Sequence, residues 1–160
     1  MDVDTIVREQ LRALLEGGNA HMTFDDAVAN FPREYMNTKP PNVPYTPWQL
    51  LEHICKAQWD ILEFISNPQY ISPPWPVGYW PVESEQADEV TWEKTLKSFR
   101  ADLHSLLEMA ADPKVNLYTP IPHGDGQTIL REILVVSDHN AYHISAVSYT
   151  HLTLPTILRV

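Results

Sequence analysis

The sequence has little cysteine, few basic side chains and no long apolar run, and each of these shortages excludes a class of protein. Cys55 is the only cysteine, which excludes an intrachain disulfide framework and favours a reducing compartment. The 11 basic residues are outnumbered by 21 acidic ones, and the formal net charge of -10 disfavours binding to nucleic acid or to an anionic membrane surface. No apolar run approaches the roughly 20 residues of a membrane-spanning helix, and the first residues lack the basic-then-apolar pattern of a signal peptide. We therefore expect a cytoplasmic protein without a nucleic-acid or membrane partner.

Helical periodicity is the main local signal along the chain. It predicts helices over about residues 4–16, 47–66, 92–111 and 127–149, and a short helix over residues 24–30. Thr46 is the predicted N-cap of the second long helix, with Gln49 completing a capping box, and Thr91 is the predicted N-cap of the third. No segment shows the alternation of a strand. Four amphipathic helices in one chain of this length predict an all-α fold, a four-helix bundle.

The connection between the second and third long helices is unusually long. Residues 68–90 form it, whereas a hairpin between antiparallel neighbours needs only a few residues. A connection of this length can return along the bundle, so that the two helices it joins are parallel. We therefore predict an up-down-down-up order, in which the second and fourth helices are antiparallel.

His139 and His143 are the most informative residues of the chain. They stand four residues apart in the predicted fourth helix, so both imidazoles leave the same face about one turn apart. One metal ion could contact both side chains. The alternative is that the two histidines have no shared function, because a His-x-x-x-His spacing arises often by chance. The spacing alone does not distinguish a metal-binding pair from a chance one.

His53 is a candidate third ligand. It lies roughly 10 Å from the N-terminal end of the second helix, and the histidine pair lies roughly 9–15 Å from the C-terminal end of the fourth. These levels coincide only if the two helices are antiparallel, as the loop length predicts. Its position on the helix is compatible with a cavity between helices and also with an ordinary helix-edge site. Three imidazoles favour zinc, nickel, copper or iron over magnesium or calcium, and three protein ligands leave a position for water or substrate.

The sequence around these histidines resembles the DinB/YfiT-like superfamily. The resemblance is carried by WQLLEHI at residues 48–54, by TILRE at 128–132 and by DHNAYHI at 138–144, and it covers roughly residues 5–146. It implies a four-helix bundle of up-down-down-up topology. It also implies that His53, His139 and His143 bind one divalent metal ion, for which zinc or nickel is expected.

The resemblance also indicates a range of activities. Some members of the superfamily are similar to thiol S-transferases that use low-molecular-weight thiols, and others to isomerases or hydrolases. We therefore expect a metal-dependent enzyme that activates a thiol or water for attack on a small molecule. The alternative is a non-catalytic helical binding or dimerisation module with a vestigial or structural metal site, and a homodimer is compatible with either reading.

The resemblance ends shortly after His143. Residues 147–155 read VSYTHLTLP, in which serine and threonine are poor helix formers and Pro155 is predicted to block a helix. We therefore divide the chain into a DinB-like domain at residues 1–146 and an atypical tail at 147–160. Our hypothesis is that this tail is not the natural C-terminus. His151 is accordingly treated as incidental to the metal site.

Other polar and aromatic residues have both a functional and a structural interpretation. Glu132 lies two turns before His139 and is a candidate hydrogen-bond acceptor or general base, although a helix-pairing carboxylate fits its spacing as well. Asp60 shares the face of His53, and a solvated carboxylate is its simplest interpretation. The loop aromatics are predicted either to cover a pocket or to attach the long connection to the bundle; they are Trp75, Tyr79 and Trp80. For Cys55 a buried structural thiol is favoured over a nucleophile.

Overall fold

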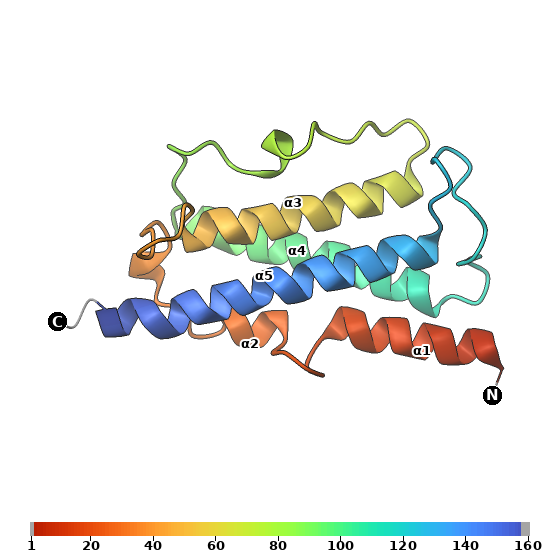
Figure 1. Cartoon of the computed structure of the whole chain (residues 1–160), viewed down its shortest axis with the longest axis horizontal. Coiled ribbons are helices and arrows are strands. Elements are labelled where there is room, and N and C mark those ends of the chain that lie inside the picture. The colour runs from red at the N-terminus through yellow and green to blue at the C-terminus, as the bar shows by residue number, and fades with distance from the viewer. Residues whose placement is uncertain (1, 158–160) are drawn as a thin grey trace.

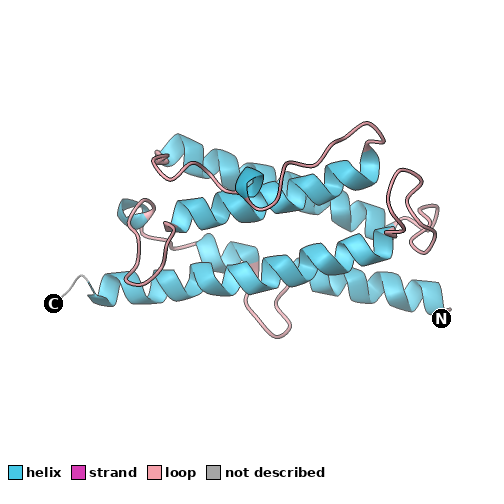
Figure 2. Cartoon of the chain, turned by 45° about the horizontal axis from the view of Figure 1, so that its top comes forward, coloured by secondary structure: helices cyan, strands magenta, loops and turns pink. Residues whose placement is uncertain are grey.

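The structure is a computed structural model in which helices form all the long elements. It describes the backbone of residues 2–157 and the side chains of residues 2–147. In chain order the elements are α1 (Val3–Glu16), α2 (Phe24–Val28), η1 (Arg33–Tyr35), α3 (Pro47–Ser66), η2 (Val77–Tyr79), α4 (Glu89–Ala111) and α5 (Ile129–Ile157). Figure 2 shows helices joined by loops, and no strand occurs among the described residues. The all-α prediction is therefore confirmed. None of the helices in the described part of the chain combines the length and the apolar character needed to cross a membrane.

Side-chain caps set the starts of α2 and α3. The Thr46 hydroxyl accepts a hydrogen bond from the backbone N–H of Gln49, and the Gln49 side chain accepts one from the backbone N–H of Thr46. Thr23 and Asp26 form the same reciprocal pair at the start of α2. Each pair satisfies two backbone donors that the first turn leaves without partners. The predicted starts of both helices are confirmed.

The prediction that Thr91 caps the third long helix is wrong. The N-cap is Asp88, whose carboxylate accepts a hydrogen bond of 2.7 Å from the backbone N–H of Thr91. Thr91 therefore occupies the third helical position. Aspartate caps a helix at least as well as threonine, so two good caps three residues apart leave the start ambiguous in the sequence.

The predicted end of the last helix, near Tyr149, is also wrong. The backbone of α5 stays helical to Ile157, through Pro155. A proline removes one backbone donor, but extending an existing helix requires no new nucleus, so the loss of one hydrogen bond does not end it. Beyond Val147 the side chains of the predicted tail, His151 included, lie outside the described residues, and the domain boundary at residue 146 stays a prediction.

The long helices lie side by side with α3 and α4 pointing in one direction. In Figure 1, α3 and α4 run from left to right, whereas α1 and α5 run from right to left. The connection between α3 and α4 passes back along the outer side of α3 and contains η2 near its middle. Helices α3 and α5 are therefore antiparallel neighbours, the arrangement on which the level of the three histidines depends.

The core between α3, α4 and α5 is mainly apolar, and a line of hydrogen-bonded side chains crosses it. Fully buried residues include Leu50, Ile54 and Trp92. Across this core Gln58 donates to the Phe99 carbonyl at 2.8 Å and accepts from Asn140 at 2.9 Å. Because buried amides need such partners, these hydrogen bonds favour one orientation of α5 about its own axis relative to α3. Asn140 immediately follows His139, so the same line orients the face of α5 that carries His139 and His143.

Candidate metal centre

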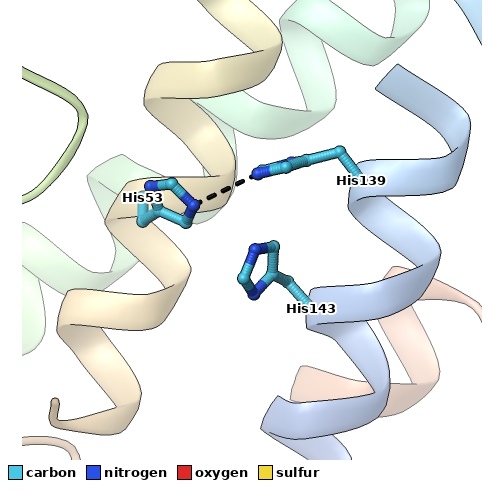
Figure 3. A group of neighbouring side chains, drawn as sticks. All are labelled: His53, His139 and His143. Atoms are coloured by element: carbon cyan, nitrogen blue, oxygen red, sulfur yellow. Dashed lines mark hydrogen bonds between the residues drawn. The ribbon is translucent and has the colours of Figure 1, made fainter. Parts of the chain in front are cut away.

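The three predicted histidines come together between α3 and α5. Figure 3 shows His53 projecting from α3 toward His139 and His143 on α5. One nitrogen from each ring can be chosen so that all three lie within 4.8 Å of one another. Among the described residues they form the one group of three or more potential ligands of this kind. These three side chains could therefore hold a metal ion.

The separation of His53 and His139 fits a shared ion. The Nε2 atoms of His53 and His139 are 3.1 Å apart. Two imidazole nitrogens at the usual 2.0–2.1 Å from a tetrahedral zinc lie about 3.3 Å from each other. The buried Nδ1 of His143 has no hydrogen-bond partner among the described residues. A buried nitrogen without a partner is costly, and coordination or a rotated ring would remove that cost.

A carbonyl of the long loop controls the protonation of His53. The Nδ1 of His53 lies 3.0 Å from the backbone oxygen of Tyr79, which can only accept. The proton of the neutral ring is therefore assigned to Nδ1, and the lone pair is left at Nε2, facing the other two histidines. Trp80 stacks on the same ring with a centroid distance of 3.9 Å and an interplanar angle of 5°. The loop thus holds both the orientation and the tautomer of His53, a common feature of metal-ligating histidines.

Burial keeps the three imidazoles neutral. It is the main reason that the pKa of His53 is lowered from its ordinary value. Burial, assisted by the neighbouring His53, lowers the pKa of His139 to about 4. Burial, assisted by His139 and His53, lowers the pKa of His143 to about 4. Neutral imidazoles are the form that binds metal, so at neutral pH the ion need not displace protons.

A pH dependence of stability follows for the metal-free protein. In the unfolded chain His139 and His143 titrate near 6.5, whereas in the folded protein the pKa of each is about 4. Between these values the unfolded state binds more protons, so stability falls as the pH is lowered from about 6.5 to about 4. Above 6.5 both states are neutral and these groups contribute no slope. Urea unfolding with a chelator at several pH values measures the effect, with the double variant His139→Asn/His143→Asn as reference. An equal slope in both proteins contradicts the assignment.

Asp60 is buried rather than solvated, which corrects its simplest sequence interpretation. Only 9% of the residue is exposed, and its two carboxylate oxygens accept hydrogen bonds from Tyr70 at 2.9 Å and from Tyr79 at 2.8 Å. Burial, together with this hydrogen bond, raises the pKa of Tyr79 to about 12. The two phenols come from the long loop, so Asp60 fastens the loop to α3. Through Tyr79 it also holds the carbonyl that contacts His53.

A pocket of about 240 Å³ lies beside His139. Apart from that histidine, its lining comes from α3, α5 and the long loop: Ala57, Asp60, Ile61, Trp75, Tyr79, Glu132 and Val135. The two expectations for the loop aromatics are therefore both met. Tyr79 is 7% exposed and attaches the loop to the bundle, whereas Trp75 is 68% exposed and forms part of the pocket wall.

Glu132 lies in the wall of this pocket and is 5% exposed. Its Oε1 accepts a hydrogen bond from Arg131, and it makes no hydrogen bond to a histidine among the described residues. Its Cα is about 10 Å along α5 from that of His139. Its predicted catalytic role is untested, and its position favours contact with a bound substrate over support of a metal ligand.

Cys55 is 8% exposed, as predicted for a structural thiol. Burial, with the Glu52 carboxylate as a smaller cause, raises the pKa of the thiol to about 12. At pH 8 the native thiolate population is then on the order of 100-fold or more below that of the unfolded chain. We expect iodoacetamide to label the native protein more slowly by at least that factor, with mass spectrometry as the readout. Comparable rates with and without urea contradict a buried thiol.

Comparison with known proteins identifies the family of the chain. The family model of the DinB superfamily matches residues 16–147, more than half of the chain. The match spans α2, α3 and α4 and includes all three histidines. No curated protein and no solved structure matches the chain. On the extent of the family match, this chain belongs to the DinB superfamily.

Proposed function

We propose that this chain is a divalent-metal-dependent enzyme in which His53, His139 and His143 bind one zinc or nickel ion. The observation that carries the proposal is the convergence of three neutral imidazoles from antiparallel helices, beside a pocket that His139 lines. The arrangement of helices in Figure 1 supports an up-down-down-up four-helix bundle as the scaffold. Membership in the DinB superfamily supports a metal-associated site.

The proposed reaction is activation of a thiol or of water for attack on a small electrophile. When bound, the ion would lower the pKa of a thiol or water in the position that three protein ligands leave open. The Tyr79 carbonyl retains the proton on Nδ1 of His53, so that Nε2 can act as a ligand. The pocket beside His139 holds the organic part of a substrate against the site. A thiol S-transferase and a hydrolase both fit this geometry, with a low-molecular-weight thiol as the proposed partner of the former.

The cellular setting is part of the same proposal. The single buried cysteine and the acidic composition support a cytoplasmic protein, where low-molecular-weight thiols are abundant. A homodimer is compatible with the apolar side chains exposed on α5, which include Leu134 and Tyr142. A non-catalytic binding module is less well supported, because the three rings converge and a pocket lies next to them.

The function is tested with a panel of low-molecular-weight thiols and small electrophiles, assayed with metal-loaded protein. We expect turnover of at least one pair, faster than the same reaction without protein, and a loss of that turnover after chelation. His143→Ala should lose it as well. Turnover that survives both treatments contradicts a metal-dependent reaction at this site. No turnover with any pair, with water as the alternative nucleophile included, favours the non-catalytic module.

A further inference from the structure

The pocket beside His139 is elongated along the helices, with a different chemistry at each end. Ala57 and Asp60 follow His53 on α3 by four and seven residues, and Val135 and Glu132 precede His139 on α5 by four and seven. Because the two helices are antiparallel, these pairs lie at matching levels. Seven residues of helix correspond to about 10 Å. His139 therefore lies at one end of the pocket, and two carboxylates lie about two turns away.

The middle of the pocket is suited to an apolar group of the size of one ring. Between the two ends the walls are formed by Ala57 and Val135 and by the rings of Trp75 and Tyr79, and Ile61 lies next to Asp60 at the far end. The volume of about 240 Å³ exceeds the roughly 150 Å³ of a cavity known to hold benzene, and it is smaller than the pockets that enclose drug-sized ligands. A single ring with a short substituent fits this space.

The far end of the pocket is negatively charged. Asp60 is 9% exposed and Glu132 is 5% exposed, and apart from His139 none of the described residues that line the pocket is basic. Arg131 is the nearby cation, but it does not line the pocket, and its contact uses only Oε1 of Glu132. Among the described residues, the hydrogen bond from Arg131 is the one that the Glu132 side chain accepts. Two carboxylates and one guanidinium leave a net negative charge, which acts strongly in a partly buried site.

We propose that this pocket selects substrates with a ring-sized apolar body and an amine or other cationic donor at the end remote from the reacting atom. The ammonium would bind Glu132, assisted by the aromatic face of Tyr79, whose hydroxyl lies 2.8 Å from Asp60 at the same end. Carboxylates and phosphates of the same size would be disfavoured at this end. The inference rests on the proposed function for the identity of the reacting end, but the pocket and its charge are independent of the metal.

Three probes of nearly equal size test the selectivity on chelator-treated protein. They are cationic benzylamine, neutral benzyl alcohol and anionic benzoate, each titrated at pH 7 and followed by ligand-detected NMR. We expect benzylamine to bind at least about tenfold more tightly than benzoate, with benzyl alcohol between them. Because no metal is present, the result does not depend on activity or on the histidine site.

Two substitutions are expected to change the selectivity in opposite directions. Glu132→Gln removes the charge at constant size and should weaken benzylamine binding by about tenfold while changing benzyl alcohol little. Arg131→Gln removes the opposing cation, is made at a side chain that is 58% exposed, and should strengthen benzylamine binding. Asp138→Asn is the matched control, since Asp138 is an exposed carboxylate on the same helix that does not line this pocket.

Several outcomes overturn the inference. They are benzoate binding as tightly as benzylamine, no binding of any probe, and equal effects of Glu132→Gln and Asp138→Asn. If Glu132→Gln unfolds the chain, as seen by circular dichroism, the Arg131→Gln result decides alone, and unchanged benzylamine affinity then contradicts the proposal. Failure of the proposed function would instead be seen as absent metal binding with probe selectivity intact, so the two failures are distinguishable.

Discussion

Replacing His143 with alanine is expected to lower the affinity for zinc or nickel by about 100-fold or more. The substitution removes one of three ligands and leaves two histidines that cannot complete the site. His143 is the best position for this test because it is only partly buried. His53, in contrast, is 2% exposed, and its replacement would also leave a cavity beside Trp80. Competition with a chromophoric chelator measures the affinity.

His104→Ala is the matched control for this prediction. His104 is exposed on α4, where its Nε2 lies 3.3 Å from Glu108 and its side chain is 72% exposed. Its removal should leave the affinity unchanged and the stability nearly so. Equal losses in the two variants would show that metal binds elsewhere or nonspecifically.

The largest expected loss of stability outside the apolar core comes from Arg8. This side chain is 8% exposed and donates to three backbone carbonyls at and just after the end of α4, those of Ala110, Asp112 and Val115, at 2.7–3.1 Å. The last carbonyls of a helix have no partners within it, and buried acceptors are costly when unpaired. Arg8→Ala should therefore lower the free energy of unfolding by about 3–5 kcal/mol, measured by urea denaturation.

The control for Arg8 lies one turn along the same helix. Arg12 contacts Glu16 at 3.3 Å, and both side chains are about half exposed. Exposed ion pairs of this kind contribute little, so Arg12→Ala should change the free energy of unfolding by no more than about 0.5 kcal/mol. Arg8→Lys should fall between the two, since one ammonium cannot span the carbonyls that a guanidinium reaches. A loss for Arg8→Ala as small as that for Arg12→Ala contradicts the capping role.

The cluster of three histidines was the part of the structure most accessible from the sequence. Helical spacing places His139 and His143 on one face, and the distances of the histidines from the helix ends predict that His53 lies level with them. The convergence of the three rings agrees with that prediction. Periodic segments and short capping patterns are local signals, so the helices α2 and α3 and their starts were predictable as well.

The surroundings of the site could not be predicted in the same way. The contacts of Tyr79 with His53 and Asp60 join positions 26 and 19 residues apart through a loop that has no periodicity. The sequence therefore shows that the loop contains aromatic residues. It does not show which of them stacks on His53 or lines the pocket. The burial of Asp60 could not be predicted either, because it depends on contacts with the same loop. The hydroxyl groups of Tyr70 and Tyr79 in that loop are suitable hydrogen-bond donors for a buried carboxylate.

Where two local signals compete, the sequence is ambiguous. Asp88 and Thr91 are both good N-caps three residues apart, and the structure uses the first. Serine, threonine and Pro155 oppose a helix after residue 147, yet the backbone of α5 stays helical to Ile157. Propensity is a weak effect compared with the continuation of a helix that is already formed.

The most direct test of the central claim is elemental analysis of the chain purified without an affinity tag. The convergence of His53, His139 and His143 predicts about one equivalent of a divalent transition metal per chain, and its loss in His143→Ala. Zinc or nickel is the expected ion. A native protein that carries no such metal and takes up none on incubation with zinc or nickel would contradict the assignment of these histidines as a metal centre.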